Sequence, residues 1–482
     1  MYTLYRNQTN QTQNVISTRI NSSITCIVGL GSLFLSAKEL PVTGSGSYVA
    51  SSTSSGATIK FTIDSQTLCL SGRVVFSNMG TVETNKHVLL GSILSAFPSI
   101  KLRPNGTQVE EIVNPGPVFA RLWDLVLDRS AKLALSAMLL FDPVNPGAQG
   151  IILNSNNSSG TGGDSHNNMN SNSTFAFCIP IPCIISQMAN YFPLYASNVD
   201  FEFTLDNPSN YITQVVTATA SIPTVTFSNL ELFFQTVRFE GEAFAKVLEA
   251  TPPQDGMLCL KSSTWLYNAV NLPASLGVGR TDLLYSVQAK SIKRIVMWAT
   301  PSNAPGKLFD GVQPNSSGIQ LVTGSTTWPA QPVSWDNPAI VMAENQRALS
   351  ALFSSSHCGN IHPKSFGRAS TEFNDYYDAY NTDAANLALA VESATGALGF
   401  ASVPLTDCSL LQNKFVYIMD CESLNGQRDG LYHGLSSRGT SSTIRLNIAT
   451  ALPAYAHTFS MWSEVDTKIL IHPDLFQTVV DN

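Results

Sequence analysis

The chain has 482 residues, of which 27 are Lys or Arg and 34 are Asp or Glu, so charged residues make up 13%, about half the usual globular share. The formal net charge of -7 gives no long-range attraction to phosphate and argues against a protein that coats nucleic acid directly. With 44% hydrophobic residues the chain can bury large cores, which excludes global disorder.

The first apolar stretch lies between Arg19 and Lys38, where no charged residue occurs. Asn, Ser and Gly residues interrupt it and mostly polar residues precede it, so a buried strand explains it better than a signal peptide. No run elsewhere approaches the ~18 to 20 apolar residues of a membrane span. We therefore expect a soluble protein.

Alternating apolar and polar residues predict half-buried strands along most of the chain. Residues 59–63 are the first clear example, since Ile, Phe and Ile alternate with Lys and Thr. Residues 99–103 and 108–112 flank Asn105 and Gly106, a pair that supplies the positive φ angles of a tight hairpin. Further strands are predicted over residues 201–205, 224–239, 291–299, 415–419, 444–448, 455–461 and 468–471.

The strongest helix prediction covers residues 118–138. An apolar face that includes Phe119 and Leu122 alternates there with a polar face that includes Arg121. Asp128 and Lys132 are spaced for an i,i+4 ion pair on that polar face, and this supports the helix further.

Other helical segments are predicted at fewer places. Asn337 and Pro338 are typical of an N-cap and a first-turn proline, and they open a second helix that runs toward Phe353. A short helical stretch is predicted over residues 241–250. Residues 387–391 fit either a strand or a helix.

Two features divide the chain. Pro252 and Pro253 end the helical stretch near the midpoint, and a new run of strands follows, which predicts two all-β domains of similar length. In the segment 154–174, 16 of 21 residues are Asn, Ser or Gly and only Met169 is apolar. Such a segment cannot build a core, so a long solvated loop is predicted.

Sequence signatures of common enzyme sites are absent, including a phosphate-binding loop, a GxSxG elbow and HExxH. Candidate metal ligands or paired acids are His357, Cys358 and His362, then Asp375, Asp378 and Asp383, and then Asp420, Glu422 and Asp429. The first group lacks a fourth ligand, the second does not match an EF-hand, and the third borders an Asn-Gly turn that is expected to leave it solvated. Three histidines lie on separate predicted strands or turns, namely His433, His457 and His472. We therefore expect no catalytic, cofactor-binding or metal-ligating residues, no cofactor and no enzymatic activity.

The eight cysteines are scattered, without a CxxC pair, so free thiols made in a reducing compartment are expected. Glycosylation sequons would matter only in a secretory pathway. They begin at Asn7, Asn10, Asn21, Asn105, Asn156, Asn157, Asn172 and Asn315.

Three parts of the sequence are similar to a known family. The parts are residues 31–41, 46–48, 59–63 and 68–70 at the start, 94–97, 109–110 and 122–133 in the first half, and 443–448, 453–455 and 465–472 at the end. Together they resemble double jelly-roll major capsid proteins of Polinton-like viruses, adintoviruses and virophages, in the adenovirus-like capsid lineage. The lead-in departs from that family's usual double proline and has Leu40 and Pro41 instead.

The resemblance implies an all-β fold of two eight-stranded antiparallel jelly-roll sandwiches side by side, a double jelly roll, with a few short helices in connecting loops. It implies an N-terminal extension over residues 1–44, a first jelly roll over 45–239, a linker over 240–254 and a second jelly roll over 255–482. Strands of period 2 with polar outer positions suit two sheets packed face to face.

The resemblance also implies a function, that of a major capsid protein of a DNA virus. Three chains would form a pseudo-hexameric capsomer that tiles an icosahedral virion shell, with segment 154–174 as a candidate for the outer towers. The partners would be other copies of the chain, neighbouring capsomers, and penton and minor capsid proteins, without direct sequence-specific nucleic acid binding; an internal membrane is left open. The chain would be made in the host cytoplasm. Its low charge agrees, since charged residues are depleted from interface cores.

Two other functions fit an all-β chain. One is a secreted carbohydrate-binding or adhesive β-sandwich protein that is glycosylated at the sequons. The other is a β-sandwich glycoside hydrolase that uses acids such as Asp420 and Glu422.

Overall fold

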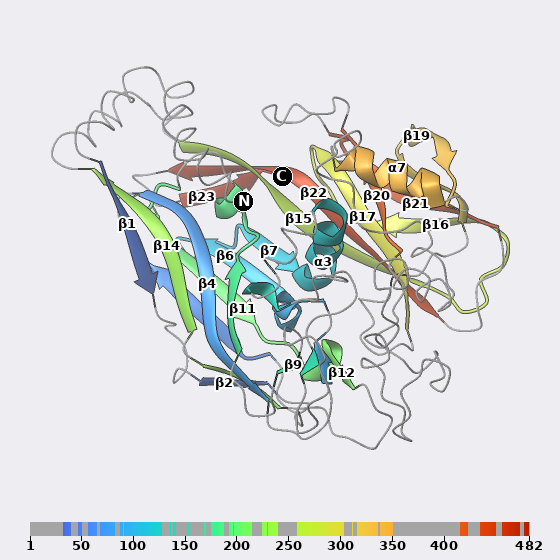
Figure 1. The fold of residues 1–482 in the computed structure, drawn as a ribbon. Coiled ribbons are helices and arrows are strands. Elements are labelled where there is room, and N and C mark those ends of the chain that lie inside the picture. The colour runs from blue at the N-terminus through green and yellow to red at the C-terminus, as the bar shows by residue number, and fades with distance from the viewer. Residues whose placement is uncertain are drawn as a thin grey trace, which may run out of the picture.

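A computed structural model shows two β-sandwiches that lie side by side (Figure 1). The structure describes residues 32–39, 47–50, 56–64, 68–81, 87–89, 91–127, 135, 138–140, 152–153, 168–169, 175–187, 192–195, 197–214, 224–228, 230–239, 258–302, 311, 316–335, 338–349, 415–422, 434–449, 456–472 and 477–481. The helical stretch predicted over 241–250, the Pro252 and Pro253 break and the segment 387–391 lie outside these residues.

The second half of the chain folds as a jelly roll. One sheet has the order β15 (Leu258–Leu272), β22 (His457–His472), β17 (Ile292–Pro301) and β20 (Tyr417–Asp420), with β23 (Gln477–Asp481) beside β22. The facing sheet has the order β16 (Gly279–Tyr285), β21 (Ser442–Ile448), β18 (Ser316–Thr323) and β19 (Thr326–Val333). Counted along the chain, strands one, eight, three and six therefore face strands two, seven, four and five, which is the jelly-roll order.

The first half repeats this order. One sheet is built from β1 (Ser32–Glu39), β14 (Leu230–Phe239), β4 (Leu68–Thr81), β13 (Val225–Ser228) and β2 (Ser47–Ala50), with β10 (Phe175–Pro180) also paired to β4. The other has the order β3 (Thr58–Ile63), β11 (Val199–Thr204), β6 (Ser99–Pro104) and β7 (Glu110–Val113). With β1 and β2 counted as the first strand and β13 and β14 as the eighth, the two rolls have the same topology.

Shorter elements complete the first roll. A small sheet contains β12 (Ile212–Gln214), β5 (His87–Leu89), β8 (Ile152–Leu153) and β9 (Asn168–Met169). The short helices are η1 (Ile93–Ala96), α5 (Ile184–Gln187) and η2 (Pro208–Asn210). Since β9 pairs in parallel with β8, two residues of the predicted loop 154–174 form a strand, and the rest of that loop lies outside the described residues.

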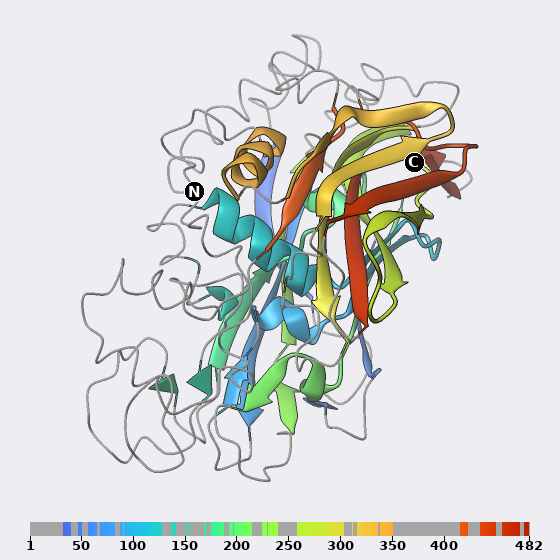
Figure 2. The ribbon, with the colours of Figure 1, turned by 90° about the vertical axis from the view of Figure 1, so that its right-hand side faces the viewer.

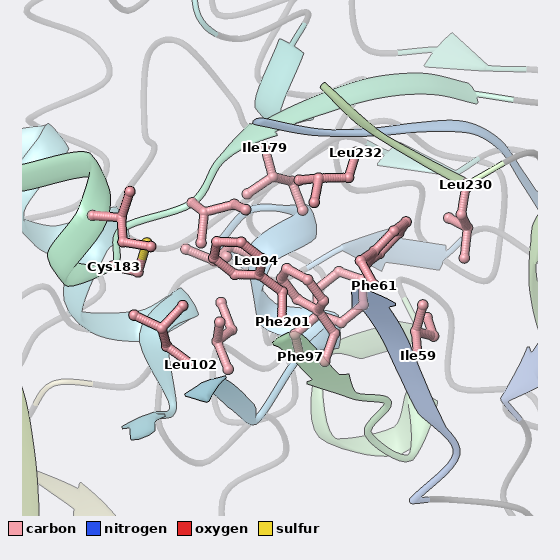
Figure 3. Packing of buried hydrophobic residues seen from close by; sticks show 14 of the residues in the cluster. Ile59, Phe61, Leu94, Phe97, Leu102, Ile179, Cys183, Phe201, Leu230 and Leu232 are labelled. Carbon is pink, nitrogen blue, oxygen red and sulfur yellow. The ribbon is translucent and has the colours of Figure 1, made fainter. Parts of the chain in front are cut away.

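Each roll has its own hydrophobic core. In the first, the alternation predicted for β3 places Ile59, Phe61 and Ile63 inward. Figure 3 shows Ile59 and Phe61 among other side chains of this core. Phe61 meets Phe203 edge to face with ring centroids 6.0 Å apart. In the second, Trp335 lies 5.1 Å from the ring of Phe415, among buried residues of both sheets. Both predicted sandwiches are thus present, each with a large buried core.

A helix follows the fifth strand in both rolls. These helices are α3 (Pro115–Val126), between β7 and β10, and α7 (Pro338–Ala348), between β19 and β20. The proline at the start of α7 agrees with the predicted position, and Phe353 lies outside the described residues.

The helix predicted over 118–138 was wrong at both ends. It begins at Pro115, directly after Asn114 in the left-handed conformation, and it stops at Val126 because Leu127 is extended. Leu135 and Leu139 are helical again and form a separate small cluster with Leu127. The apolar residues of both helical segments follow one helical period in the sequence, so the pattern predicted a single helix. The second segment packs on a different cluster from α3.

Two strand predictions also need correction. The strand predicted over 224–239 is split, since β13 pairs with β2 while β14 pairs with β1. The strands predicted over 455–461 and 468–471 are one continuous strand, β22. Its polar middle is buried because partners satisfy it, as where the Tyr285 hydroxyl lies 2.6 Å from the Ser463 hydroxyl.

The turn between β6 and β7 lies where the sequence predicted it. The hairpin of β6 and β7 pairs Ile100 with Ile112, and both Asn105 and Gly106 have positive φ, as predicted.

The first described strand, β1, lies within the predicted extension 1–44 but pairs along its whole length with β14. We therefore place the start of the first roll at β1.

Gly116 provides a test of how α3 is seated. A Cβ added at Gly116 would lie 2.6 Å from Ser95 Cα and 2.8 Å from Ser95 N, which are backbone atoms that cannot rotate away. We expect Gly116→Ala to lower the free energy of unfolding by about 1–3 kcal/mol. Chemical denaturation measures this change.

Gly277→Ala is the matched control, because no atom lies within 4 Å of a Cβ added there. Its effect should stay within about 0.5 kcal/mol. Equal effects of the two substitutions would contradict the described seat of α3 on η1.

Candidate functional site

The two rolls meet along one continuous contact, which we call the seam. The first roll contributes β7, α3 and α5, and the second contributes β15, β17 and β22 (Figures 1 and 2). Val118 and Leu125 of α3 are buried in the core cluster of the second roll. The ring of Phe119 lies 5.8 Å from that of Trp265 in an edge-to-face arrangement, so a helix of the first roll completes the packing of the second.

A stack of aromatic and cationic groups forms the centre of the seam. Trp298 and Trp462 stack with ring centroids 4.3 Å apart, and the guanidinium carbon of Arg121 lies 5.9 Å from the Trp298 ring centroid. The indole Nε1 of Trp462 donates a hydrogen bond of 3.1 Å to the carbonyl oxygen of Val113. Cation–π attraction is stronger away from water, and Arg121 is fully buried.

Glu110 is the buried carboxyl of the seam. Its Oε1 accepts a hydrogen bond of 2.6 Å from the Thr264 hydroxyl of the second roll, and its Oε2 accepts one of 2.8 Å from the Ile184 backbone N–H. Burial raises the pKa of Glu110 to about 7, and the two hydrogen bonds oppose this rise. Ser262 extends the same contact, since its hydroxyl donates to the carbonyl oxygen of Ile184 at 3.1 Å.

A row of charges of alternating sign crosses one sheet of the second roll. Glu464 on β22 pairs with Arg294 on β17, and Arg294 Nη1 donates at 3.1 Å to the last carbonyl of α7, that of Ala348. Arg347 on α7 lies 2.6 Å from Glu344. The row fixes α7 to its roll by charge-assisted hydrogen bonds.

Asp420 belongs to this row, and the prediction that it is solvated was wrong, because it is buried among its partners. Only 5% of Asp420 is exposed. Its Oδ1 accepts a hydrogen bond from the Glu422 backbone N–H, and its backbone carbonyl oxygen accepts one from Trp328 Nε1. Its Oδ2 lies 3.9 Å from Arg347 Nε. Burial raises the pKa of Glu422, while Arg294 and Lys293 lower it. These contacts explain the two acids as parts of a structural network.

Most of the other candidate residues lie outside the described part of the chain. These are His357, Cys358, His362, Asp375, Asp378, Asp383, Asp429 and His433. His457 is buried at the start of β22 and His472 ends that strand. Among the described residues, no group of three or more His, Cys, Asp or Glu side chains is placed to hold a metal ion.

Four cysteines lie in the described part of the chain. Cys183 and Cys421 are buried, Cys178 and Cys259 are partly buried, and no disulfide joins any of these four. Within the described ranges, no helix combines the length and apolarity that a membrane crossing requires.

The seam was not predicted from the sequence. The apolar and polar pattern placed Arg121 on the polar face of the predicted helix, but α3 is covered on both sides and Arg121 is 0% exposed. Glu110 lies in the predicted hairpin segment 108–112, and its burial was not predicted. A detectable signal was the pair Glu110 and Glu111, because adjacent residues of a strand point to opposite faces and one of the two must then point inward.

No family model and no curated protein matches the sequence. Solved structures do match. PBCV-1 VP54, fitted into a cryo-EM reconstruction of the virophage Sputnik, has a TM-score of 0.53 and 9% identity over 94% of this chain and 97% of that chain. The PBCV-1 virus capsid, as a quasi-atomic model, has a TM-score of 0.51 and 10% sequence identity over 94% of this chain and 97% of that chain. The Faustovirus major capsid protein has a TM-score of 0.50 and 9% sequence identity over 91% of this chain and 90% of that chain. The chain therefore has the double jelly-roll fold of these capsid proteins.

The raised pKa of Glu110 predicts a pH dependence of stability. Because the folded value of about 7 lies above the ordinary 4.5, the folded state holds this proton more tightly than the unfolded state. Its contribution, about 3 kcal/mol, is complete below pH 4.5 and is lost as the pH rises to about 7. Glu110→Gln should remove this slope, as measured by urea unfolding at a series of pH values.

Glu111→Gln is the matched control, on the outer face of the same strand. Burial raises the pKa of Glu111, but the Ser99 hydroxyl and Lys101 outweigh that effect and lower it. The control should therefore change stability only in the acid range and leave the slope up to pH 7 intact. An unchanged slope in Glu110→Gln would show that Glu110 is not buried in the seam.

Proposed function

We propose that this chain is a major capsid protein that builds the icosahedral shell of a DNA virus. The observation that carries the proposal is the repeated strand order of two rolls joined by one buried seam, in the fold of the capsid proteins named above. In such a chain, two rolls of the same topology are joined rigidly, and this arrangement suits a subunit that tiles a surface. We propose a structural role without enzymatic activity or a cofactor.

The proposed native species is a homotrimer. Three copies of two similar rolls give six corners around a closed three-fold axis, so the capsomer has a pseudo-hexameric outline. The low charged fraction of 13% agrees with a chain that buries much of its surface between subunits. We propose residues 32–239 as the first roll, 240–254 as the linker and 255–482 as the second roll.

The proposal extends to partners and location. Neighbouring capsomers, penton proteins and minor capsid proteins would contact the trimer, and the chain would end in the virion shell after synthesis in the host cytoplasm. An internal membrane beneath the shell is compatible with it. Direct sequence-specific contact with nucleic acid is not part of the proposal, because the net charge is -7.

The alternative of a secreted adhesive or carbohydrate-binding sandwich has less support. A single sandwich would suffice for such a role, whereas this chain holds two rolls in a fixed arrangement through Glu110 and Trp462. The intact mass of protein from a eukaryotic host separates the two, since the alternative requires added sugar at the sequons.

Native mass spectrometry tests the trimer directly. Protein at micromolar concentration should give three times the 51.9 kDa chain mass, because obligate interfaces commonly bury more than about 2,000 Å² in total. Repeating the measurement at high salt is the control for weak ionic association, and the trimer should survive it. A stable monomer or dimer would contradict the capsid proposal.

A further inference from the structure

A lysine and an aspartate are in contact within the second roll. Lys293 on β17 and Asp466 on β22 belong to neighbouring strands, and Lys293 Nζ lies 3.1 Å from Asp466 Oδ1. The side chain of Asp466 is 4% exposed and that of Lys293 is 20% exposed. An amine and a carboxyl group, the two groups that can condense to an amide, are therefore held together and largely shielded from water.

A bulge in β17 places the lysine. Ile292 lies opposite Val465 and Arg294 lies opposite Glu464, so Lys293 is the extra residue between the two pairs. Such a bulge changes the direction of a side chain relative to a regular strand. The paired residues on both sides fix the backbone of Lys293, which limits the positions that its amine can take.

The second carboxylate oxygen of Asp466 has a hydroxyl donor. Ser291 Oγ donates a hydrogen bond of 2.5 Å to Asp466 Oδ2, and the Gly434 backbone N–H donates one of 3.0 Å to Ser291 Oγ. Ser291 is fully buried. A hydroxyl that accepts a hydrogen bond is a stronger donor to its own partner. One oxygen of Asp466 thus faces an amine and the other faces a fixed donor.

The segment at Gly434 keeps this hydroxyl in place. A Cβ added at Gly434 would lie 2.1 Å from the Ile292 carbonyl oxygen and 2.8 Å from Ser291 Oγ, so only glycine fits there. Leu435 and Ile292 also exchange backbone hydrogen bonds of 2.9 and 3.1 Å. The segment is therefore packed directly on Ser291.

This arrangement favours an amide over an ion pair. A buried ion pair loses the hydration of both charges, and the attraction between them offsets that cost only in part. An amide carries no charge, so its formation removes the cost. Two reacting groups held in contact also react far faster than the same groups in dilute solution.

We propose that Lys293 and Asp466 condense to an intramolecular amide that cross-links β17 and β22. A proton first moves from Lys293 Nζ to Asp466 Oδ1, which gives an amine and a carboxylic acid. The bond between Nζ and Cγ then forms, and Oδ2 takes the negative charge, which the Ser291 hydroxyl stabilises. A second proton moves from Nζ to Oδ1, the bond between Cγ and Oδ1 breaks, and water leaves.

The cross-link goes beyond the proposed function. β17 and β22 lie side by side in one sheet of the second roll (Figure 1), but residues 293 and 466 are far apart along the chain. An amide between them restricts the unfolded chain and so stabilises the folded roll. The reaction requires no oxidant, so it can proceed in a reducing compartment, where disulfides are rare.

The mass of the denatured chain tests for the amide. Protein that has been purified in the folded state should be lighter than its sequence by one water molecule. Protease digestion should release the peptides that contain residues 293 and 466 as one joined species. Lys293→Arg keeps a positive charge beside Asp466, but the guanidinium stays protonated and does not form the amide, so this variant should have the full mass of its sequence. A wild-type chain of full mass would overturn the proposal.

Lys60→Arg is the matched control. Lys60 Nζ lies 2.9 Å from Asp200 Oδ2 on a neighbouring strand of the first roll, and the Thr62 hydroxyl donates to Asp200 Oδ1 at 2.7 Å. The same groups thus meet there, but Lys60 is 32% and Asp200 12% exposed, so water solvates this pair better. Lys60→Arg should keep the loss of one water molecule. A loss that disappears in Lys60→Arg and remains in Lys293→Arg would overturn the assigned pair.

Ser291→Ala tests the role of the hydroxyl. It removes the donor to Asp466 Oδ2, so the cross-linked fraction of freshly translated chains should grow at least about 10-fold more slowly than in the wild type. Mass spectrometry at a series of times measures this rate. A structural role alone would lower the melting temperature without slowing the reaction, and an unchanged rate would overturn the role assigned to Ser291.

Thermal melting separates the amide from an ordinary ion pair. Lys293→Arg should melt roughly 10 °C below the wild type, because the unfolded chain is no longer restricted. An ion pair alone would survive this substitution, so equal melting temperatures would contradict a cross-link. The proposed function is tested separately, since the trimer mass does not depend on the amide, and a trimer of chains without the cross-link would leave that function standing.

Discussion

The two rolls are held in one arrangement because α3 is buried on both sides. Phe119 packs against the cores of both rolls, and the fully buried Arg121 lies over Trp298 of the second roll. A helix that is apolar toward two sandwiches cannot leave either one without exposing side chains that each contribute about 1.5–3 kcal/mol by burial. Rotation of one roll against the other is therefore opposed by the same forces that stabilise each core.

Polar groups give this contact its specificity. Hydrophobic packing alone tolerates sliding, but the Glu110 carboxylate and the Trp462 indole each have one hydrogen-bonding geometry across the seam. A shift of either roll would leave a buried carboxylate or N–H without its partner, at a cost of about 1–3 kcal/mol for each group. The two rolls thus behave as one rigid body that consists of two parts with the same topology.

The features that could be predicted from the sequence are those that depend on neighbouring residues of the chain. Alternation identified the buried side chains of β3, and Asn105 with Gly106 identified a hairpin, because both depend on neighbours along the chain. The end of α3 and the continuity of β22 depend instead on distant partners, such as Lys293 for Asp466. The seam was missed for the same reason, since nothing near Glu110 in sequence shows that Thr264 lies beside it.

Negative-stain electron microscopy of the purified chain tests the central claim, that two rigidly joined rolls act as equivalent corners of a ring. Class averages viewed along the particle axis should show a hexagonal outline with six lobes of similar size, at one fixed spacing. Averages that show separate two-lobed particles, with a variable angle between the lobes, would contradict both the rigid seam and the ring.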